Sequence, residues 1–201
     1  MILMTIIPII LTLGPAMIYQ AVQFLWGRKT TAFHCIWTYI MMVYVRLVFS
    51  VTGIGSVWDI IEKGGLAPTL RLAHINLVPL QSAGVFTYCT NAIMFMPLGF
   101  LLPYIWKHYR NPWKTASVGL IFSVLIEAAQ LPTSRLADID DVMMNTLGAF
   151  LGYMVWRVIG PHFFNRKEGL RTISLSNWEP VIYIVSACAG TFLLYNWKWF
   201  I

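Results

Sequence analysis

Charged residues are scarce in this sequence. Asp, Glu, Lys and Arg make up 11% of the 201 residues, whereas hydrophobic residues make up 58%. A soluble domain has about 25% charged residues, so this shortage excludes an ordinary soluble fold and indicates an integral membrane protein. A membrane-spanning helix needs roughly 20 apolar residues. The length therefore predicts one integral membrane domain over residues 1–201, an all-α polytopic helix bundle with about five or six transmembrane helices.

Cysteines and catalytic signature motifs are scarce as well. Cys35, Cys89 and Cys188 lie apart in apolar segments and form no CxxC pair. Buried apolar roles are therefore favoured over a disulfide or a metal site for these three thiols. The four histidines show no ligand spacing, and the chain has no nucleophile elbow, HExxH, P-loop or dinucleotide fingerprint. These absences exclude the enzyme classes that such motifs define.

Six apolar segments are present and alternate with polar loops. The first has no basic stretch before it and no small-residue cleavage site, so we expect a retained span rather than a cleaved signal. Residues 54–87 are less apolar and rich in Gly and Pro, and no part of them is long enough to span. We expect an interfacial or re-entrant segment there. The six predicted spans cover about Thr5–Trp26, Ala32–Gly53, Tyr88–Trp106, Thr115–Leu131, Asp141–Ile159 and Pro180–Trp197.

The basic residues predict the orientation of these helices. With the N-terminus outside, the loops that face the cytoplasm contain nine Lys and Arg residues, and the outer segments contain four. The positive-inside rule favours this arrangement, so the formal charge of +6 indicates orientation and contact with anionic lipid rather than nucleic-acid binding. We therefore expect a multi-pass protein of the cell membrane. The nine inner residues are Arg28, Lys29, Lys107, Arg110, Lys114, Arg157, Arg166, Lys167 and Arg171.

The polar residues concentrate around the connection between the fourth and fifth spans. Residues 126–152 read IEAAQLPTSRLADIDDVMMNTLGAFLG, and such a density of acids and amides beside lipid is energetically costly. At about 1.5 Å per residue, Glu127 lies roughly 6 Å from the outer end of its helix, and Asn91 and Asn145 lie at similar depth. The long stem of Arg46 can reach the same level. We therefore predict an outward-facing polar pocket, with ligand-binding residues Arg46, Asn91, Glu127, Gln130, Arg135, Asp138, Asp141 and Asn145.

Several of these side chains have a structural interpretation beside the functional one. Glu127 can pair with Arg46 or Arg135 and hold helices together, or it can contact a ligand as a binding or catalytic group. Arg135 can bind a phosphate or carboxylate in bidentate fashion, or it can neutralise the neighbouring aspartates. Asn91 can form an interhelical hydrogen bond. The NLVP sequence at residues 76–79 favours a turn over a binding role.

The three aspartates of the loop leave two interpretations open. Asp140 and Asp141 stand where helix N-caps stand, at the positive end of the helix dipole. Asp138 lies further upstream and is harder to explain as a cap. The DxDD arrangement can instead hold a divalent cation through oxygen ligands, and no other cofactor is predicted. If the site is catalytic, Glu127, Asp138 and Asp140 are the candidate residues.

Small residues mark one face of the fifth span. Asp141, Asn145, Gly148 and Gly152 follow one another at helical spacing on that face. The two glycines form a GxxxG pair, which lets a neighbouring backbone approach closely. We expect this face to turn inward and to take Asn145 with it.

The motifs of the polar region resemble those of the VanZ-like family. The sequence has NLVPL from Asn76, NAIMFMPLGFLLP from Asn91, IExxQL from Ile126 and R-x-x-D-x-D-D-x-x-x-N-x-x-G from Arg135, in the family's order and spacing. The resemblance covers about Leu72–Ile159. The family takes its name from a protein associated with teicoplanin resistance in Gram-positive bacteria, so the resemblance implies a cell-envelope membrane protein linked to glycopeptide resistance. The matching positions are Asn76, Pro79, Asn91, Pro97, Gly99, Glu127, Gln130, Arg135, Asp138, Asp140, Asp141, Asn145 and Gly148.

The leading functional hypothesis is binding of the headgroup of a membrane-embedded molecule. Membrane lipids are the expected partners, and a lipid-linked cell-wall precursor or a lipidated glycopeptide fits the compartment. Arg135, helped by Arg46, would take a phosphate or carboxylate. Glu127, Gln130 and Asn145 would take hydroxyl or amide groups.

Two other functions stand beside it. The alternative is an outer-leaflet enzyme that acts on envelope lipids or lipid-linked glycans through Glu127 and the Asp138–Asp141 cluster. A transporter is disfavoured, because we expect the cytoplasmic halves of the spans to offer few polar side chains that could complete a path.

Overall fold

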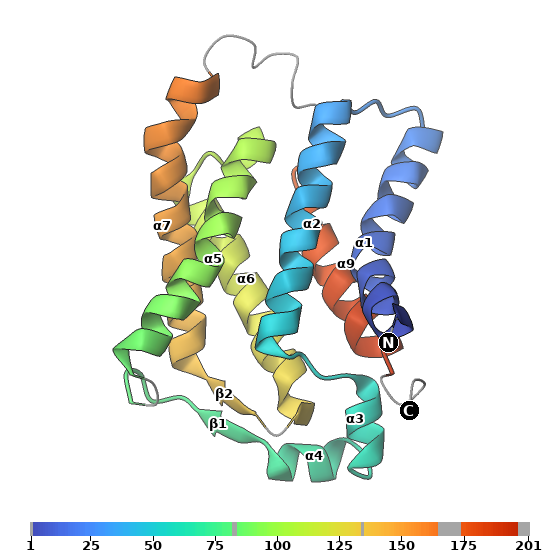
Figure 1. The fold of residues 1–201 in the computed structure, drawn as a ribbon, viewed down its shortest axis with the longest axis vertical. Coiled ribbons are helices and arrows are strands. Elements are labelled where there is room, and N and C mark those ends of the chain that lie inside the picture. The colour runs from blue at the N-terminus through green and yellow to red at the C-terminus, as the bar shows by residue number, and fades with distance from the viewer. Residues whose placement is uncertain (1, 82–83, 134, 165–173, 197–201) are drawn as a thin grey trace.

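The computed structural model describes residues 2–81, 84–133, 135–164 and 174–196, and six long helices form the bundle in these residues (Figure 1). Five of them are long and apolar enough to span a membrane, and the last is a shorter apolar helix of 16 residues. The prediction of an all-α polytopic bundle is therefore confirmed. The helices are α1 (Ile2–Leu25), α2 (Ala32–Thr52), α5 (Val85–Ile105), α6 (Pro112–Gln130), α7 (Ile139–Phe164) and α9 (Glu179–Leu194).

Local sequence signals explain where several helices begin and end. α2 follows Thr31, whose side-chain oxygen accepts the backbone N–H of His34, and it ends at Gly53, which has a left-handed φ of 65°. That conformation favours glycine, which has no Cβ to clash. α6 follows Asn111, whose side chain caps the first turn, and has Pro112 at its first position. Proline fits there because the N–H that it lacks has no partner within the helix.

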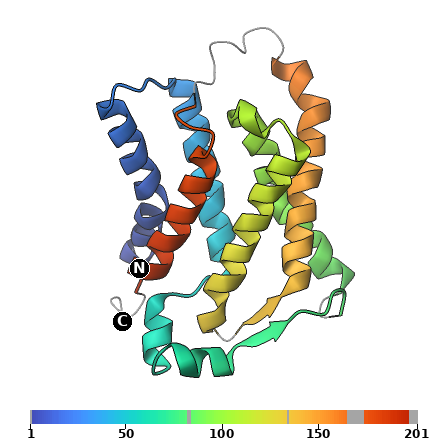
Figure 2. The same cartoon turned by 180° about the vertical axis from the view of Figure 1, so that it is seen from behind.

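The helices form two groups that pack side by side. α5, α6 and α7 form one group, in which α7 packs along both of the others, and α1, α2 and α9 form the second. Figure 2 shows α9 lying between α1 and α6. Because α9 contacts α6 and α2 contacts α5, the two groups share one apolar core.

Small residues let α5 and α7 approach closely. A Cβ added to Gly148 or Gly152 of α7 would collide with the backbone of α5 at Ala92 or Met96. Asn145 lies on the same face of α7 and is 2% exposed. The prediction that the GxxxG face turns inward together with Asn145 is therefore confirmed.

The segment before α5 lies along one end of the bundle and does not cross it (Figure 1). It contains the short helices α3 (Val57–Glu62) and α4 (Leu66–Leu72) and the strand β1 (His74–Asn76). β1 pairs in parallel with β2 (Leu136–Asp138), which directly precedes α7, so that Asn76 lies opposite Asp138. This pairing ties the loop before α5 to the loop before α7. Two 3-10 turns flank α6, η1 (Lys107–Tyr109) before it and η2 (Leu131–Thr133) after it.

The strands and the N-terminus lie at the same end of the bundle in both views (Figures 1 and 2). The connection from α1 to α2 and the η1 turn lie at the opposite end. The polar loop therefore shares an end with the N-terminus, as the sequence predicts. The assignment of that end to the outside stays a prediction. Three of the basic residues on which it depends, Arg166, Lys167 and Arg171, lie outside the described residues.

Candidate functional site

Four acids gather at the corner where α6 ends and α7 begins. α6 supplies Glu127, β2 ends with Asp138, and the first turn of α7 contains Asp140 and Asp141. Glu127, Asp138 and Asp140 are 9%, 7% and 0% exposed, and Asp141 is half-buried. We call these four residues the acidic corner. It contains all three catalytic candidates that the sequence suggests.

Asp138 connects the acids through its backbone and its side chain. Its N–H donates to Oε2 of Glu127 over 3.0 Å, and its Oδ1 accepts the N–H of Asp140 over 2.9 Å. Because α7 begins at Ile139, the second bond is an N-cap contact, and Asp138 is the cap. Asp140 and Asp141, for which the sequence leaves a capping role open, lie instead in the first turn of α7, at the positive end of the helix dipole. The pairing of β2 keeps the chain extended up to Asp138, and the helix starts directly after it.

Asp140 and Asp141 hold the chain that leads into α5. Oδ1 of Asp140 accepts the N–H of Leu80 over 2.6 Å, and its Oδ2 accepts the Tyr88 hydroxyl over 2.8 Å. Leu80 has a φ of 63°, a left-handed conformation that leucine rarely adopts. Nδ2 of Asn91 donates to Oδ1 of Asp141 over 2.5 Å, which confirms the predicted interhelical bond. The two carboxylates thus fix both the loop and the first turns of α5.

Two asparagines extend the acidic corner. Oδ1 of Asn76 accepts the N–H of Val78 over 3.1 Å, which forms the predicted turn, and its Nδ2 lies 3.3 Å from Oδ1 of Asp138. Nδ2 of Asn145 donates to Oγ of Ser123 over 2.9 Å. Among the described residues, Oδ1 of Asn145 is buried without a hydrogen-bond partner.

Gln130 and Arg135 close the C-terminal end of α2. Nε2 of Gln130 and Nη1 of Arg135 both donate to the carbonyl oxygen of Thr52, over 2.6 and 2.5 Å. The last carbonyl groups of a helix have no partner within the helix, so such donors are needed there. The guanidinium also covers Gly53, where a Cβ would lie 3.0 Å from Cζ of Arg135. Both side chains therefore have a structural task beside the predicted ligand contact.

Arg46 lies apart from the acidic corner. It is half-buried on α2. In the part of the chain that the structure describes, it forms no hydrogen bond or ion pair with Glu127 or Asp141. The structure therefore brings together the predicted residues of α5, α6, β2 and α7, and it leaves Arg46 outside this group.

The acidic corner is rich in negative charge and poor in cations. No group of three His, Cys, Asp or Glu side chains among the described residues is arranged to hold a metal ion. Within the same residues, neither Glu127 nor Asp141 has a Lys, Arg or His at ion-pair distance. Burial disfavours a charged carboxylate, and neighbouring negative charges disfavour it further. The corner is therefore costly unless a proton or a cation compensates part of its charge.

A surface pocket of about 230 Å³ adjoins the acidic corner. Glu127 and Asp138 are the acidic members of its wall, and the other lining side chains are apolar and come from α6, β2, α7 and the chain around β1. Among them, Leu77, Ile75 and Val124 are 72%, 56% and 49% exposed. The predicted polar pocket thus takes the form of an apolar pocket with two buried carboxylates in its wall.

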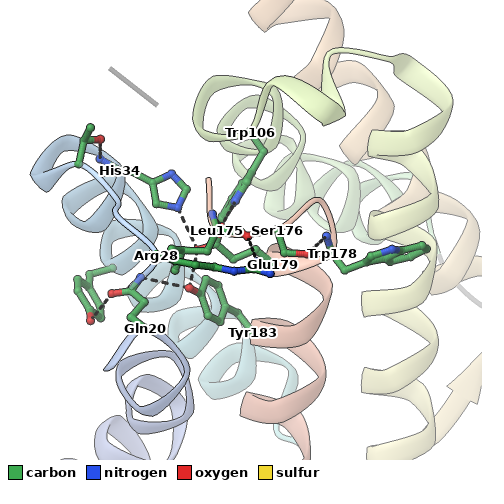
Figure 3. A network of polar contacts seen from close by, with 11 residues as sticks. Gln20, Arg28, His34, Trp106, Leu175, Ser176, Trp178, Glu179 and Tyr183 are labelled. Atoms are coloured by element: carbon green, nitrogen blue, oxygen red, sulfur yellow. Dashed lines mark hydrogen bonds and ion pairs between the residues drawn. The ribbon is translucent and has the colours of Figure 1, made fainter. Parts of the chain in front are cut away.

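A second buried carboxylate lies at the opposite end of the bundle (Figure 3). Glu179, the first residue of α9, is fully buried, and Nε2 of His34 lies 3.0 Å from its Oε1. The same carboxylate accepts the Tyr183 hydroxyl over 2.6 Å, Nε1–H of Trp106 over 3.0 Å and the N–H of Leu175 over 3.1 Å. We call this group the Glu179 network. Donors from α2, the end of α5, α9 and the loop before α9 meet on one side chain.

The Glu179 network includes Gln20 of α1, and a further hydrogen bond lies at the same end of the bundle. Nε2 of Gln20 donates to the Tyr183 hydroxyl over 3.2 Å, and the Tyr39 hydroxyl donates to Oε1 of Gln20 over 2.8 Å. Nearby, burial raises the pKa of Tyr109 to about 12, so its hydroxyl stays protonated and donates to the carbonyl of Asn177 over 2.9 Å. These contacts join both groups of helices.

The sequence analysis missed the Glu179 network. His34 and Glu179 are 145 residues apart, and no local spacing connects them. The expectation that this half of the bundle has few polar side chains is wrong, because each span contributes a single polar residue that meets the others only after folding. A usable signal exists nonetheless. His34, Trp106 and Glu179 stand at ends of three predicted spans that an alternating topology brings to the same side.

These features define a polytopic membrane protein whose polar motifs meet at one end of a helix bundle. The family model described as VanZ/LLP1 matches residues 35–160, well over half of the chain. The chain belongs to the VanZ/LLP1 family. The match includes the predicted core of Leu72–Ile159 and extends to α2, whereas α1 and α9 lie outside it.

Part of the chain is also similar in sequence to a characterised member of this family. Protein VanZ of Enterococcus faecium is 35% identical to this chain over 95 residues, which cover 46% of this chain and 58% of that protein. The aligned part is thus less than two thirds of that relative. No solved structure matches the chain.

Proposed function

We propose that this VanZ-family protein binds a membrane amphiphile at the outer leaflet, with the apolar chain in the pocket and the headgroup against Glu127 and Asp138. The observation that carries the proposal is the pocket itself, about 230 Å³ in volume and mainly apolar, with these two buried carboxylates in its wall. An amphiphile has both kinds of surface and therefore matches both parts of the wall.

The apolar part of the wall suits an alkyl or acyl chain. Ile75, Leu77 and Val124 expose apolar surface that is unfavourable in water and favourable against a hydrocarbon chain. Drug-sized ligands occupy roughly 300–1,000 Å³, and this pocket of about 230 Å³ is smaller. We therefore propose that it holds one end of a chain while the rest of the molecule stays in the bilayer or in water.

The carboxylates suit a headgroup that donates hydrogen bonds. Oε2 of Glu127 accepts the N–H of Asp138, and Oε1 accepts no hydrogen bond from the described residues. A hydroxyl, amide or amine of the ligand can donate to this oxygen, and hydrogen bonds to charged groups contribute about 1.5–3 kcal/mol.

The compartment narrows the choice of ligand. The distribution of Lys and Arg predicts that this end of the bundle faces outside. Lipid-linked cell-wall precursors and lipidated glycopeptides are amphiphiles that can occupy that leaflet. The association of the family with teicoplanin resistance supports the second, and we extend the proposal to a lowered sensitivity of the cell to that antibiotic.

Photolabelling tests the proposal. Protein in lipid nanodiscs is incubated with an alkyl amphiphile that has a photoreactive group near the end of its chain, and labelled peptides are mapped. We expect labels on the pocket wall, and we expect Val124→Trp, which fills the pocket, to remove most of them. Leu120→Trp is the matched control, because Leu120 is 43% exposed one turn earlier on α6 and does not line the pocket. Equal labelling of wild type and Val124→Trp would contradict the proposal.

Cysteine labelling tests the orientation on which the compartment depends. In a chain with Cys35, Cys89 and Cys188 replaced by alanine, Glu62→Cys reports the end with α3, and Lys107→Cys reports the other end. A membrane-impermeant maleimide added to intact cells should label Glu62→Cys only. The reverse pattern would place the acidic corner in the cytoplasm and exclude the proposed ligands.

An enzyme is the second candidate, because two carboxylates in one pocket wall can act as general acid and base. Purified protein is incubated with envelope lipids and lipid-linked glycans, with and without a chelator. Turnover that Glu127→Gln abolishes would favour the enzyme, whereas binding without turnover favours a binding protein.

A further inference from the structure

We infer that the headgroup recognised at this pocket is a cation, and that the ligand class is a primary ammonium carried on an apolar chain. This inference rests on the proposed function and specifies the chemistry of its ligand. It follows from the charge at the acidic corner, from an oxygen of Glu127 that has no hydrogen-bond donor among the described residues, and from the position of the nearest arginine of the motif.

The charge of the acidic corner favours a positive ligand. Glu127 is 9% exposed, and it shares the corner with three further carboxylates. Among the described residues, neither Glu127 nor Asp141 has a basic side chain at ion-pair distance. Buried carboxylates are stable when they are paired or protonated. A ligand cation supplies the pairing that the described part of the protein does not give to these two groups.

The hydrogen bonds leave one position for a donor at the wall of the pocket. Glu127 lines the pocket, and its Oε2 already accepts the N–H of Asp138 over 3.0 Å. Its Oε1 has no donor among the described residues. Glu127 is 9% exposed as a residue, and this oxygen is not among the fully buried unpartnered atoms of the described residues, so a ligand can reach it. An ammonium group has three N–H donors and can serve Glu127 while its apolar chain contacts Val124 and Leu77.

The position of Arg135 argues against an anionic headgroup in the pocket. Arg135 does not line the pocket, and its Nη1 donates to the carbonyl of Thr52. A phosphate or carboxylate in the pocket would therefore meet Glu127 and Asp138 without a basic residue in the lining. A divalent metal ion is disfavoured as well, because no three His, Cys, Asp or Glu side chains in the described residues are arranged around one.

A series of amphiphiles with the same chain tests the inference on the unchanged protein. Dodecylammonium, dodecyltrimethylammonium, dodecanol and dodecyl phosphate compete with the photoreactive alkyl probe in nanodiscs of neutral lipid. We expect dodecylammonium to compete at a concentration at least about tenfold lower than dodecanol, and dodecyl phosphate to compete least. Dodecyltrimethylammonium should fall between the first two, because it has the charge but no N–H donor.

Each result of this series supports or overturns the inference. Equal competition by dodecanol and dodecylammonium, or a preference for dodecyl phosphate, overturns the cationic headgroup and leaves amphiphile binding intact. No competition by any dodecyl compound overturns the proposed function together with the inference. Because the ranking is measured on wild-type protein, it does not depend on the folding of a variant.

A variant then assigns the preference to one residue. Glu127→Gln keeps the shape and an oxygen that can accept the Asp138 N–H, but it removes the charge. We expect the affinity for dodecylammonium to fall by about 30-fold or more, as is typical for loss of one member of a buried charge pair, and the affinity for dodecanol to fall by a smaller factor. Glu62→Gln is the matched control, since Glu62 is exposed on α3 at the same end and does not line the pocket. If Glu127→Gln still preferred dodecylammonium over dodecanol as strongly as wild type, the preference would not depend on Glu127, and the inference would be overturned.

Discussion

The two ends of this bundle bury carboxylates in opposite ways. At one end, Glu179 is a single carboxylate that four groups contact, one of which is His34. At the other end, the acidic corner holds four carboxylates whose identified donors are backbone N–H groups, amides and a phenol. The first arrangement surrounds one charge with donors from several elements. The second accumulates like charge beside a pocket.

This difference indicates what each end is for. A carboxylate that is fully enclosed by donors holds its surroundings together, and it leaves no position for a ligand. Carboxylates that repel one another reduce stability, and they are retained where a ligand, a proton or a reaction compensates for them. The Glu179 network thus fits a structural role, and the acidic corner fits a functional one. The following four variants test this comparison.

Glu179→Gln should have the largest effect on stability. It removes the charge that His34 and three further donors share, and the amide nitrogen of Gln must face at least one of those donors. Breaking a buried ion pair on one side costs about 3–5 kcal/mol, so we expect the free energy of unfolding in detergent to fall by that amount. Glu62→Gln, at an exposed position of α3, should change it by no more than about 0.5 kcal/mol. Equal unfolding of wild type and Glu179→Gln would refute a structural role for the network.

Tyr88→Phe should have the next largest effect. It removes the hydroxyl that donates to Oδ2 of the buried Asp140, and hydrogen bonds to charged groups contribute about 1.5–3 kcal/mol. Tyr109→Phe is the matched change at the other end, where the hydroxyl donates to the neutral carbonyl of Asn177. For Tyr109→Phe we expect the free energy of unfolding to fall by about 0.5–1.5 kcal/mol. A larger loss for Tyr109→Phe in denaturant unfolding would reverse the proposed ranking of the two contacts.

Glu127→Gln should change stability by less than about 1 kcal/mol. The Gln oxygen can accept the N–H of Asp138, and loss of one negative charge relieves repulsion at the acidic corner. The contrast with Glu179→Gln is the sharpest test of the comparison, because the two substitutions are chemically identical. A drop of several kcal/mol in the unfolding free energy of Glu127→Gln would assign a structural role to the acidic corner as well.

Arg135→Ala should have the smallest effect. Its exposed guanidinium donates one hydrogen bond to the carbonyl oxygen of Thr52, which also accepts a hydrogen bond from Gln130. Because substitutions at exposed positions change the free energy of unfolding by about 0.5 kcal/mol or less, we expect a loss within that range and no change in competition by dodecylammonium. Arg28→Ala is the matched change at the other end, where Nη1 donates to the carbonyl of Leu175 over 2.7 Å. A strong loss of amphiphile binding in Arg135→Ala would revive the phosphate interpretation of this arginine.

The spans were predictable because each depends on local composition. The predicted ends at Trp26, Gly53, Trp106 and Leu131 each lie one residue beyond the end of the observed helix. Runs of apolar residues, closed by Gly, Pro or a charge, report such ends directly. The pairing of Asn91 and the inward face of Asn145 were predictable for the same reason, since both follow from depth and helical spacing.

Contacts between distant segments were not predictable in the same way. The strand pairing that makes Asp138 the cap of α7 joins segments separated by two spans, and the three-residue strands have no periodic pattern of their own. Gln130 and Arg135 were read as ligand contacts because their target, the end of α2, is a backbone carbonyl that no sequence pattern marks. The apolar character of the pocket depends on the strand pairing that brings Ile75 and Leu77 to the same pocket as Val124, which the sequence leaves open.

The parallel strand pair sets the order in which this protein can be completed during synthesis. Asn76 emerges from the ribosome long before its partner Asp138, which lies 62 residues further along the chain. At about 5–20 residues per second, β1 waits roughly 3–12 s for β2. A nascent chain that already has α1 to α6 in the translocon therefore still lacks one wall of its pocket, and only the arrival of α7 allows the pocket to close.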